Sequence, residues 1–531
     1  MSTTIVASMS LVNGLWATGA VGNQRLYPAR TRGPQELDSM RYVTTDLWQQ
    51  ERMLVNGELI AASAEKVFEN INPATEEVIG CVADGSADDM DSAIGGARRA
   101  FDSTTWSTDV EFRVHCLRQL SEALGRNAER LRSTIVAEVG SPVLLTYGPQ
   151  LDTPLAGINW VADLVEHYSW EVDLGTLAPF GAPSRRYTRR EATGVVGAIT
   201  PWNFPMQINL AKVIPALGAG NTIVLKPAPD TPWTATLLGQ LVTEETDIPA
   251  GVFNVVTSQD HQVGAQLSAD PRVDLVSFTG STSTGRRIMM AASQTIKRTF
   301  LELGGKSAMI ALDDADMTKV AAAAAMQITA HAGQGCAITS RLLLPRSRYD
   351  EGAEAAISAI GAIPYGDPTD SSVLMGPLIR ESQRERVLGY VQRGLEEGAT
   401  VAVGGGIPSH LDRGYFVEPT ALVDVDPTST VAQEEIFGPV LVIIGYNDDD
   451  DAVRIANLSS YGLSGAVVSA DLERARTIAN RVRTGTISLN GGTYYGIDVP
   501  FGGYRQSGIG RESGVAGFEE YLEIKSIAEP A

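Results

Sequence analysis

A single cysteine, Cys336, stands in the stretch "HAGQGCAITS", directly after a Gly-Gln-Gly step. The alanine-rich segment before it predicts a helix, with Asp313 and Asp314 at its N-terminal cap. Gly333 and Gly335 then break the helix, because glycine permits positive φ and the close approach of a ligand. A cysteine placed there can offer its sulfur and its backbone N–H to one ligand, and a nearby helix N-terminus would favour its reactive thiolate.

The alternative interpretation of a lone cysteine is a small buried core residue. We give that interpretation to Cys81, in a strand-like run, and to Cys116, on a helix-like one. His331, five residues before Cys336, raises a second alternative, a cysteine–histidine hydrolase. Such a site also needs an orienting Asn or Asp, which no local pattern indicates.

Two other stretches carry side chains that suit acyl chemistry. "TPWNFP" places Asn203 between two prolines, whose rings fix the backbone and present the amide rigidly. A fixed amide N–H is a suitable donor to a developing oxyanion. "LELGGKS" places Glu302 between leucines, where burial would raise its pKa and make it a usable general base. Their ordinary alternatives are an Asx turn and a surface glutamate.

Two further stretches suit a bound ligand. "FTGSTSTG" (278–285) is a glycine and hydroxyl loop after a predicted strand, able to hold a phosphate with backbone amides. It matches neither G-x-G-x-x-G nor the Walker pattern. "EEIFGPV" joins Glu434 and Glu435 to Phe437 and a Gly-Pro break.

The composition limits the class of protein. The chain has 531 residues and a net charge of −21, so an acidic surface argues against nucleic acid as a partner. Three cysteines without a C-x-x-C spacing and five scattered histidines predict neither a disulfide framework nor a metal site. No apolar run approaches the ~20 residues of a membrane helix. These features predict a reduced, cytoplasmic protein.

The elements that must position these residues alternate between strand and helix, which predicts an α/β fold with a parallel sheet. Apolar runs bounded by Gly, Pro or Asn predict strands at 194–200, 221–228, 251–258 and 274–280. Helices are predicted at 87–102, 111–140 and 234–246. A second set of strand-like runs after Cys336 predicts a second α/β domain. "NDDDDAV" (447–453) predicts a helix N-terminus rather than an acidic site.

Taken together, seven motifs resemble the aldehyde dehydrogenase superfamily in order and spacing, from about residue 53 to the C-terminus. They are "TPWNFP", "IVLKPAP", "FTGSTSTG", "LELGGKS", "GQGC", "EEIFGPV" and "PFGGYRQSGIGRE". Asn203 lies 133 residues and Glu302 lies 34 residues before Cys336, as the resemblance requires.

The resemblance implies roles for four catalytic residues. Cys336 would attack an aldehyde carbon, and the Asn203 amide with the Cys336 backbone N–H would hold the oxyanion. After hydride transfer, Glu302 would activate water to hydrolyse the thioester. Lys212, on the helix after Asn203, matches a residue that assists proton movement. No metal is implied.

The resemblance also implies the cofactor, NAD or NADP with a lean to NAD, and its contacts. Lys226 and Glu435 match ribose contacts, and Phe437 packs beside the nicotinamide. The remaining implied contacts are Ile199, Trp202, Pro229, Gly280, Ser281, Gly285, Leu303 and Gln383. NAD-preferring members often carry a glutamate where this chain has Pro229, which leaves the choice between NAD and NADP open.

The implied substrate tunnel is apolar and roomy. Ile208 and Ala211 lie three residues apart, on one face of the helix after Asn203. Tyr495 and Phe501 should line the opposite wall. This lining does not name an aldehyde.

By resemblance, the fold is α/β and aldehyde dehydrogenase-like, with three parts. A doubly wound dinucleotide-binding domain spans 53–173 and 193–304, the α/β catalytic domain spans 305–504, and a small β oligomerisation element spans 174–192 and 505–531. Residues 1–52 are predicted to be a poorly ordered extension. The assembly implied is a homo-oligomer, a tetramer or dimer, with a small-molecule aldehyde as partner and no nucleic acid or membrane.

Two alternatives to a hydrolytic enzyme remain. A CoA-acylating semialdehyde dehydrogenase usually lacks a glutamate at the position of Glu302. A non-catalytic relative, kept as a structural or binding protein, would not require Cys336, Asn203 and Glu302 together.

Overall fold

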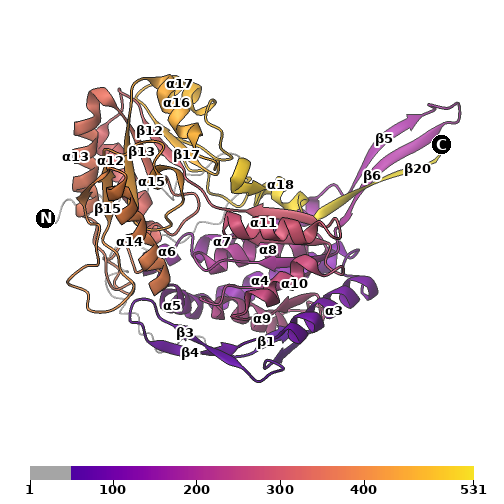
Figure 1. Cartoon of the computed structure of the whole chain (residues 1–531). Helices are drawn as coiled ribbons and strands as arrows, with labels where there is room; N and C mark the ends of the chain where they lie inside the picture. The colour runs from indigo at the N-terminus through magenta and orange to yellow at the C-terminus, as the bar shows by residue number, and fades with distance from the viewer. Residues whose placement is uncertain (1–49) are drawn as a thin grey trace.

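The structure, a computed structural model, describes residues 50–531. The predicted extension, residues 1–52, therefore lies outside the described residues except for its last three positions. Two large sheets with helices on their faces form two α/β units, and a three-stranded sheet projects away from them (Figure 1). This arrangement confirms the predicted α/β class. No helix within residues 50–531 has the length and apolarity to cross a membrane.

The first sheet has eight strands, and its central strands are parallel. In sheet order they are β19 (Gly508–Ile509), β11 (Arg298–Glu302), β10 (Leu275–Thr279), β7 (Val195–Ile199), β8 (Thr222–Lys226), β9 (Phe253–Val255), β1 (Met53–Val55) and β2 (Glu58–Ile60). Strands β7 to β11 pair in parallel, and the outer strands β19, β1 and β2 pair antiparallel. The four strands predicted from apolar runs are confirmed as β7, β8, β9 and β10.

Helices cover both faces of this sheet because its strands are apolar on both sides. Successive residues belong to opposite cores: Val196 and Ile223 to one, Val195 and Val224 to the other. The helices of this unit are α3 (Ala87–Ser103), α4 (Val110–Arg126), α5 (Ala128–Val139), α6 (Val143–Thr146), α7 (Asp152–His167), α8 (Pro205–Gly218), α9 (Trp233–Glu245), α10 (His261–Ala269) and α11 (Thr282–Ala292).

The second sheet has seven strands and confirms the predicted second α/β set. In order they are β14 (Thr400–Val403), β15 (Thr420–Val423), β16 (Val440–Tyr446), β13 (Arg341–Pro345), β12 (Ala308–Ala311), β17 (Gly465–Val468) and β18 (Ser488–Leu489). Its helices are α12 (Met317–Thr329), α13 (Tyr349–Gly361), α14 (Glu381–Glu396), α15 (Thr430–Gln433), α16 (Asp449–Leu458) and α17 (Leu472–Ala479). Leu343 and Leu344 again face separate cores.

The projecting sheet joins distant segments of the chain. Its order is β20 (Leu522–Pro530), β6 (Ser184–Ala192) and β5 (Glu171–Leu177), all antiparallel. It leaves the body as a long ribbon in Figure 1. A separate hairpin, β3 (Val67–Ile71) with β4 (Val78–Ala83), lies at the other end of the molecule, and α18 (Gly514–Glu519) precedes β20.

Two local predictions are wrong. The single helix predicted at 111–140 is two helices, α4 and α5, which meet at Asn127 with φ −100° and ψ 11°. The Asn127 side chain donates to the Ala123 carbonyl oxygen and to Glu245, so it satisfies the end of α4 instead of continuing the helix.

The second wrong prediction concerns a helix cap. The alanine-rich helix α12 begins after Asp316, whose carboxylate accepts from the backbone N–H groups of Thr318 and Lys319. Asp313 pairs instead with Arg474, at 2.5 Å. The predicted acidic N-terminus at 447–453 is confirmed, because Asp448 caps α16 by accepting from the Asp451 N–H.

Candidate active site

The candidate residues collect at one edge of the first sheet, where its parallel strands end. The segment after β7 carries Trp202 and Asn203, β8 ends at Lys226, the segment after β10 carries Gly280 and Ser281, and β11 ends at Glu302. Ile199, the last residue of β7, belongs to the same edge. Ligands of open parallel sheets bind outside these carboxyl ends.

Cys336 follows a left-handed turn that comes from the second unit. The three residues from His331 to Gly333 have φ angles of 50°, 53° and 72°. A Cβ at Gly333 would lie 2.0 Å from the carbonyl oxygen of Gly438, so this turn requires glycine. The Cys336 carbonyl oxygen lies 2.4 Å from the position of a Cβ at Gly305. The cysteine loop therefore packs directly on the loop that follows Glu302.

Asn203 is bonded to this cysteine loop. Its side-chain Nδ2 donates to the Gln334 carbonyl oxygen at 2.8 Å, and its own carbonyl oxygen accepts from Gln150 at 2.9 Å. Asn203 is buried, so its amide is held in one orientation. Because an amide nitrogen has two hydrogens, the second remains to donate to a ligand oxygen beside Cys336.

Glu302 is a buried carboxylate whose oxygens have no hydrogen-bond partner within residues 50–531. Burial raises the pKa of Glu302 well above its ordinary value, and the charge of Glu512 raises it further, while Lys212 and Arg511 oppose the shift. An unpartnered carboxylate with a raised pKa is able to accept and hold a proton.

Lys212 is fully buried and paired with a residue that the sequence reasoning missed. Its Nζ donates to Glu512 at 2.8 Å and to Ser277 at 3.2 Å. Glu512 lies in "GIGRES", where nothing local distinguishes it from a surface glutamate. Its proximity to Lys212, 300 positions away, arises only in the fold.

The expected thiolate of Cys336 is not favoured by its surroundings. Burial, followed by the charges of Glu302, Glu435 and Glu512, raises the pKa of Cys336. In the chain, the cysteine is followed by the strand β13 and not by a helix. The resting thiol therefore needs a base to remove its proton.

His331 does not have the character of that base. It is fully buried, its ring packs edge-to-face on Phe204 with centroids 5.3 Å apart, and burial lowers its pKa to about 3. This argues against the cysteine–histidine hydrolase.

Glu435 also lies against the two glycines of "LELGGKS". Its Oε1 accepts from the Gly305 N–H at 2.9 Å, and a Cβ at Gly304 would lie 2.3 Å from its Oε2. Burial raises the pKa of Glu435 to about 7. Phe437 packs edge-to-face on Trp202, with ring centroids 5.4 Å apart.

The predicted cofactor residues of the first unit line the strand ends. Lys226 is buried and donates to the Ser258 carbonyl oxygen at 2.8 Å, and Pro229 follows it on the same segment. Gly280 and Ser281 directly precede α11, and Ser281 caps that helix by accepting from the Thr284 N–H. Gly285 lies against Leu303, since its Cβ would be 2.8 Å from a Leu303 methyl carbon.

Gln383, another predicted cofactor contact, is hydrogen-bonded within the protein. Its Nε2 donates to the Phe437 carbonyl oxygen at 2.8 Å. The structure thus brings Gln383 to the loop of Glu435 and Phe437.

The predicted substrate side is aromatic and apolar. Ile208 and Ala211 lie on α8, and Ile208 is buried. Tyr495 stacks on Phe501 with ring centroids 6.4 Å apart, and Tyr494 contacts Tyr495 at 4.7 Å. Burial raises the pKa of Tyr494, and the charge that Cys336 carries as a thiolate adds to the shift.

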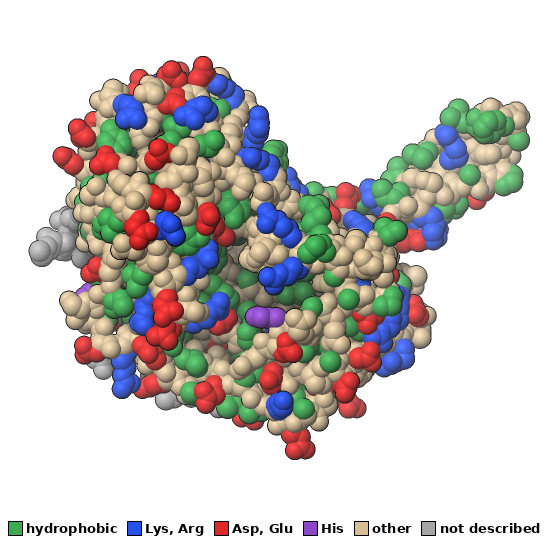
Figure 2. Space-filling view, viewed as in Figure 1, with side chains coloured by type: hydrophobic (Ala, Val, Ile, Leu, Met, Phe, Trp, Pro, Cys, Tyr) green, Lys and Arg blue, Asp and Glu red, His purple; other side chains and the backbone are tan. Residues whose placement is uncertain are grey.

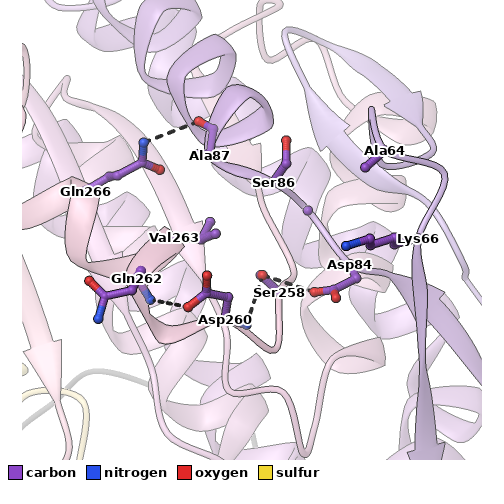
Figure 3. Close-up of a pocket in the computed structure, with 11 residues that line it drawn as sticks. Ala64, Lys66, Asp84, Ser86, Ala87, Ser258, Asp260, Gln262, Val263 and Gln266 are labelled. Atoms are coloured by element: carbon purple, nitrogen blue, oxygen red, sulfur yellow. Dashed lines mark hydrogen bonds between the residues drawn. The ribbon is translucent and has the colours of Figure 1, made fainter.

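A separate cavity of about 490 Å³ lies between the N-termini of α3 and α10 (Figure 3). Its wall includes Lys66, Asp84, Ser86, Ser258 and Gln266. Figure 3 shows that some of these polar groups are bonded within the protein: Ser258 to Asp84, and Gln266 to the Ala87 carbonyl. None of the predicted catalytic residues lines it.

The arrangement suits nucleophilic chemistry on a carbonyl beside a bound dinucleotide. A helix N-terminus favours phosphate, the Lys226 ammonium and Glu435 carboxylate suit ribose hydroxyls, and Trp202 with Phe437 suits a flat ring. Figure 2 shows the molecule hollowed between its two units, with Lys and Arg side chains around the hollow. Within residues 50–531, no group of three His, Cys, Asp or Glu side chains could hold a metal ion.

Known proteins match this chain along nearly all of its described residues. The model of the aldehyde dehydrogenase family matches residues 60–527. The 3-succinoylsemialdehyde-pyridine dehydrogenase of a Pseudomonas species is 42% identical over 476 residues, which are 89% of this chain and 97% of that protein.

Solved structures give the same result. A Mycobacterium tuberculosis aldehyde dehydrogenase complexed with NAD+ is 38% identical, with a TM-score of 0.87 over 91% of this chain and 98% of that chain. The betaine aldehyde dehydrogenase of Staphylococcus aureus, also in complex with NAD+, is 35% identical, with a TM-score of 0.88 over 91% of this chain and 95% of that one.

Proposed function

The chain belongs to the aldehyde dehydrogenase family, and from that premise we propose that it oxidises an aldehyde to a carboxylic acid with NAD+ or NADP+. The reaction passes through a thiohemiacetal and a thioester on Cys336. One observation supports this proposal most strongly. Cys336, Asn203 and Glu302 come from three separate segments and lie together at the ends of β7 and β11.

In the first step, the Cys336 sulfur bonds to the aldehyde carbon. Because the pKa of the thiol is raised, a base must take its proton, and the unpartnered Glu302 carboxylate is the base at hand. The carbonyl oxygen becomes an oxyanion, held by the free hydrogen of Asn203 Nδ2 and by the Cys336 backbone N–H. When bound, the dinucleotide supplies the acceptor for the hydride, and loss of that hydride leaves a thioester.

In the second step, water cleaves the thioester. Once Glu302 has released the proton that it took from the thiol, it takes a proton from the water, and the water oxygen bonds to the acyl carbon. The carbon–sulfur bond then breaks, the sulfur regains a proton from Glu302, and acid and thiol are released. The buried Lys212–Glu512 pair lies close enough to shift the pKa of Glu302, and it provides a route by which the proton leaves the site.

The residues present fit a dinucleotide. Lys226 and Glu435 would hold ribose hydroxyls, Gly280 and Ser281 at the start of α11 would hold the pyrophosphate, and Trp202 with Phe437 would flank the nicotinamide. NAD is favoured because the similar solved structures hold NAD+. Pro229 offers no carboxylate to repel a 2′-phosphate, so activity with NADP is also expected.

The acylating alternative is disfavoured because Glu302 is present and buried beside the site as a base for water. The non-catalytic alternative is disfavoured as well. An unpartnered buried carboxylate such as Glu302 lowers stability, and a protein without catalytic activity gains nothing from it beside Cys336 and Asn203.

We also propose a homo-oligomer, a tetramer or a dimer, in the cytoplasm. The projecting sheet supports assembly: Val172, Leu174 and Leu177 of β5 are exposed, and Phe180 in the following turn is 98% exposed. Three free cysteines support a reducing compartment. The domain bounds 53–173 with 193–304, 305–504, and 174–192 with 505–531 remain part of this proposal.

Assay of a panel of aldehydes with NAD+ and NADP+ in parallel tests the function. Reduced cofactor and carboxylic acid should appear in equal amounts without CoA. A strong requirement for CoA would replace hydrolysis with the acylating alternative, and absence of any cofactor reduction across the panel would overturn the proposal.

A further inference from the structure

The loop at residues 434–438 (the 434–438 loop) connects α15 to β16 and has no regular structure of its own. It carries Glu435 and Phe437, two of the proposed cofactor contacts. Phe437 has φ 61°, a left-handed conformation that is uncommon for a bulky residue. The loop must therefore be held by contacts from outside.

Side chains of one helix, α14, supply hydrogen bonds to this loop. The Arg386 Nη2 donates to the Glu435 carbonyl oxygen at 2.7 Å, and its Nε is 3.4 Å from that of Ile436. The Gln383 Nε2 donates to the Phe437 carbonyl oxygen at 2.8 Å. Three successive carbonyl groups of the loop are thus held by two side chains.

A third residue of α14 completes the set. The Tyr390 hydroxyl donates to Glu434 Oε2 at 2.8 Å, and the Arg386 guanidinium lies 5.0 Å from the centroid of the Tyr390 ring. Gln383, Arg386 and Tyr390 are spaced by three and four residues, so they share one side of the helix (the α14 face).

The loop also packs between α14 and the nucleophile turn. A Cβ at Gly438 would lie 2.3 Å from Val387 on α14, and the Gly438 carbonyl oxygen lies 2.0 Å from the position of a Cβ at Gly333. The backbone of Gly438 therefore has α14 on one side and the turn that leads to Cys336 on the other. Displacement of the loop would therefore change the positions of both the cofactor contacts and Cys336.

We propose that the α14 face positions the 434–438 loop for catalysis, with Arg386 as its central positioning residue. Arg386 acts through the backbone of Glu435 and Ile436, which sets the Glu435 carboxylate and the Phe437 ring for cofactor binding and hydride transfer. The planar guanidinium fork bonds two carbonyl groups at once, which a lysine ammonium cannot do with the same geometry. This inference rests on the proposed function.

The test compares Arg386→Met and Arg386→Lys with Arg384→Met. Arg384 lies on the same helix but donates to Gly414, outside the loop, at 3.2 Å, and so provides a matched control. Because Arg386 is exposed, its loss leaves no unpaired buried charge, and the variants should fold. The readouts are NAD+ affinity, followed by tryptophan fluorescence, KM for NAD+ and for aldehyde, and the burst of reduced cofactor with ordinary and 1-deuterated aldehyde.

For Arg386→Met we expect NAD+ affinity to fall about tenfold or more, as for lost charge-assisted hydrogen bonds. The burst should slow and show a larger isotope effect, while the KM for aldehyde changes little. Arg386→Lys should recover only part of the loss, and Arg384→Met should match the wild type.

Equal NAD+ affinity and burst rate in Arg386→Met and Arg384→Met would overturn the inference. So would full recovery in Arg386→Lys, because charge alone would then explain the effect. A wild-type protein that binds NAD+ but oxidises no aldehyde would overturn the proposed function, while the affinity comparison would still decide the role of Arg386. A wild-type protein without NAD+ binding would overturn both.

Discussion

The carboxylate of Glu302 lies against the backbone of Gly502: a Cβ on Gly502 would come within 2.7 Å of Glu302 Oε1 and 2.8 Å of the Gly510 carbonyl oxygen. Glu302 ends β11, and Gly502 belongs to the "PFGGYRQSG" motif, 200 residues later. The space for the proposed base is therefore defined by the absence of a side chain in a distant segment.

Gly502→Ala should displace the Glu302 carboxylate and slow deacylation about as much as loss of a general base, ~10²-fold or more in kcat. The burst of reduced cofactor should still form but more slowly, because Glu302 is also the proposed base for the thiol. Gly389→Ala is the control, because nothing lies within 4 Å of a Cβ at that exposed position of α14. Unchanged turnover in Gly502→Ala would show that Glu302 tolerates another position.

Cys336→Ala should abolish aldehyde oxidation and leave NAD+ binding nearly intact, because the thiol forms the covalent bond and does not hold the dinucleotide. Binding is measured by fluorescence titration and activity by the absorbance of reduced cofactor. Cys81→Ala, in β4 and outside the site, should retain activity. Aldehyde-dependent reduction by Cys336→Ala would contradict the assignment of the nucleophile.

Glu302→Gln should slow steady-state turnover by ~10²–10⁴-fold, because the thioester then waits for water without a base. About one reduced cofactor per site should still form, with the acyl group on the Cys336 peptide by mass spectrometry. Because Glu302 is also the proposed base for the thiol, this burst should be slower than in the wild type. An unchanged steady-state rate would make Glu302 a structural carboxylate.

The pH dependence of hydrolysis should follow the ionisation of Glu302. The base is active when ionised, so kcat should fall as the pH drops through the raised pKa of Glu302. Lys212 lowers that pKa and Glu512 raises it. Lys212→Met should therefore shift the acid limb to higher pH, and Glu512→Gln should shift it to lower pH. Shifts in the same direction would contradict the electrostatic assignment.

Arg341→Met should destabilise the second unit. The Arg341 guanidinium is buried and donates to the carbonyl oxygens of Lys306, Ile455 and Ala456 at 2.9, 3.0 and 2.9 Å. Leaving buried carbonyl groups unsatisfied costs about 1–3 kcal/mol each. The melting temperature should fall by several degrees, whereas Arg346→Met, at an exposed position of the same segment, should change it little. Equal melting temperatures would show that water replaces the guanidinium.

The sequence by itself determined the α/β class, the central strands and the family. Runs such as those of β7 and β8 are apolar at successive positions, and only a strand buried on both faces needs that pattern. The acidic N-terminus of α16 was also predictable, because capping depends on neighbouring residues alone. Ordered motifs around Asn203, Glu302 and Cys336 identified the candidate site.

Other local features depend on tertiary contacts that a local pattern does not contain. The break between α4 and α5 follows from the contact of Asn127 with Glu245, on another helix. The cap of α12 is Asp316 and not the predicted Asp313, because Asp313 is paired with Arg474, 161 positions away. The same limit applies to the thiol, whose raised pKa comes from burial and from three carboxylates of distant segments.

Only the tertiary structure decided how the site is completed. The partnership of Lys212 with Glu512, the bond from Asn203 to the Gln334 carbonyl and the contacts of Arg386 with the 434–438 loop join residues far apart in the chain. Each residue alone resembles an ordinary lysine, amide or surface arginine. Electrostatic and hydrogen-bond energies depend on distance in space, so these roles appear only when folding brings the partners within about 3 Å.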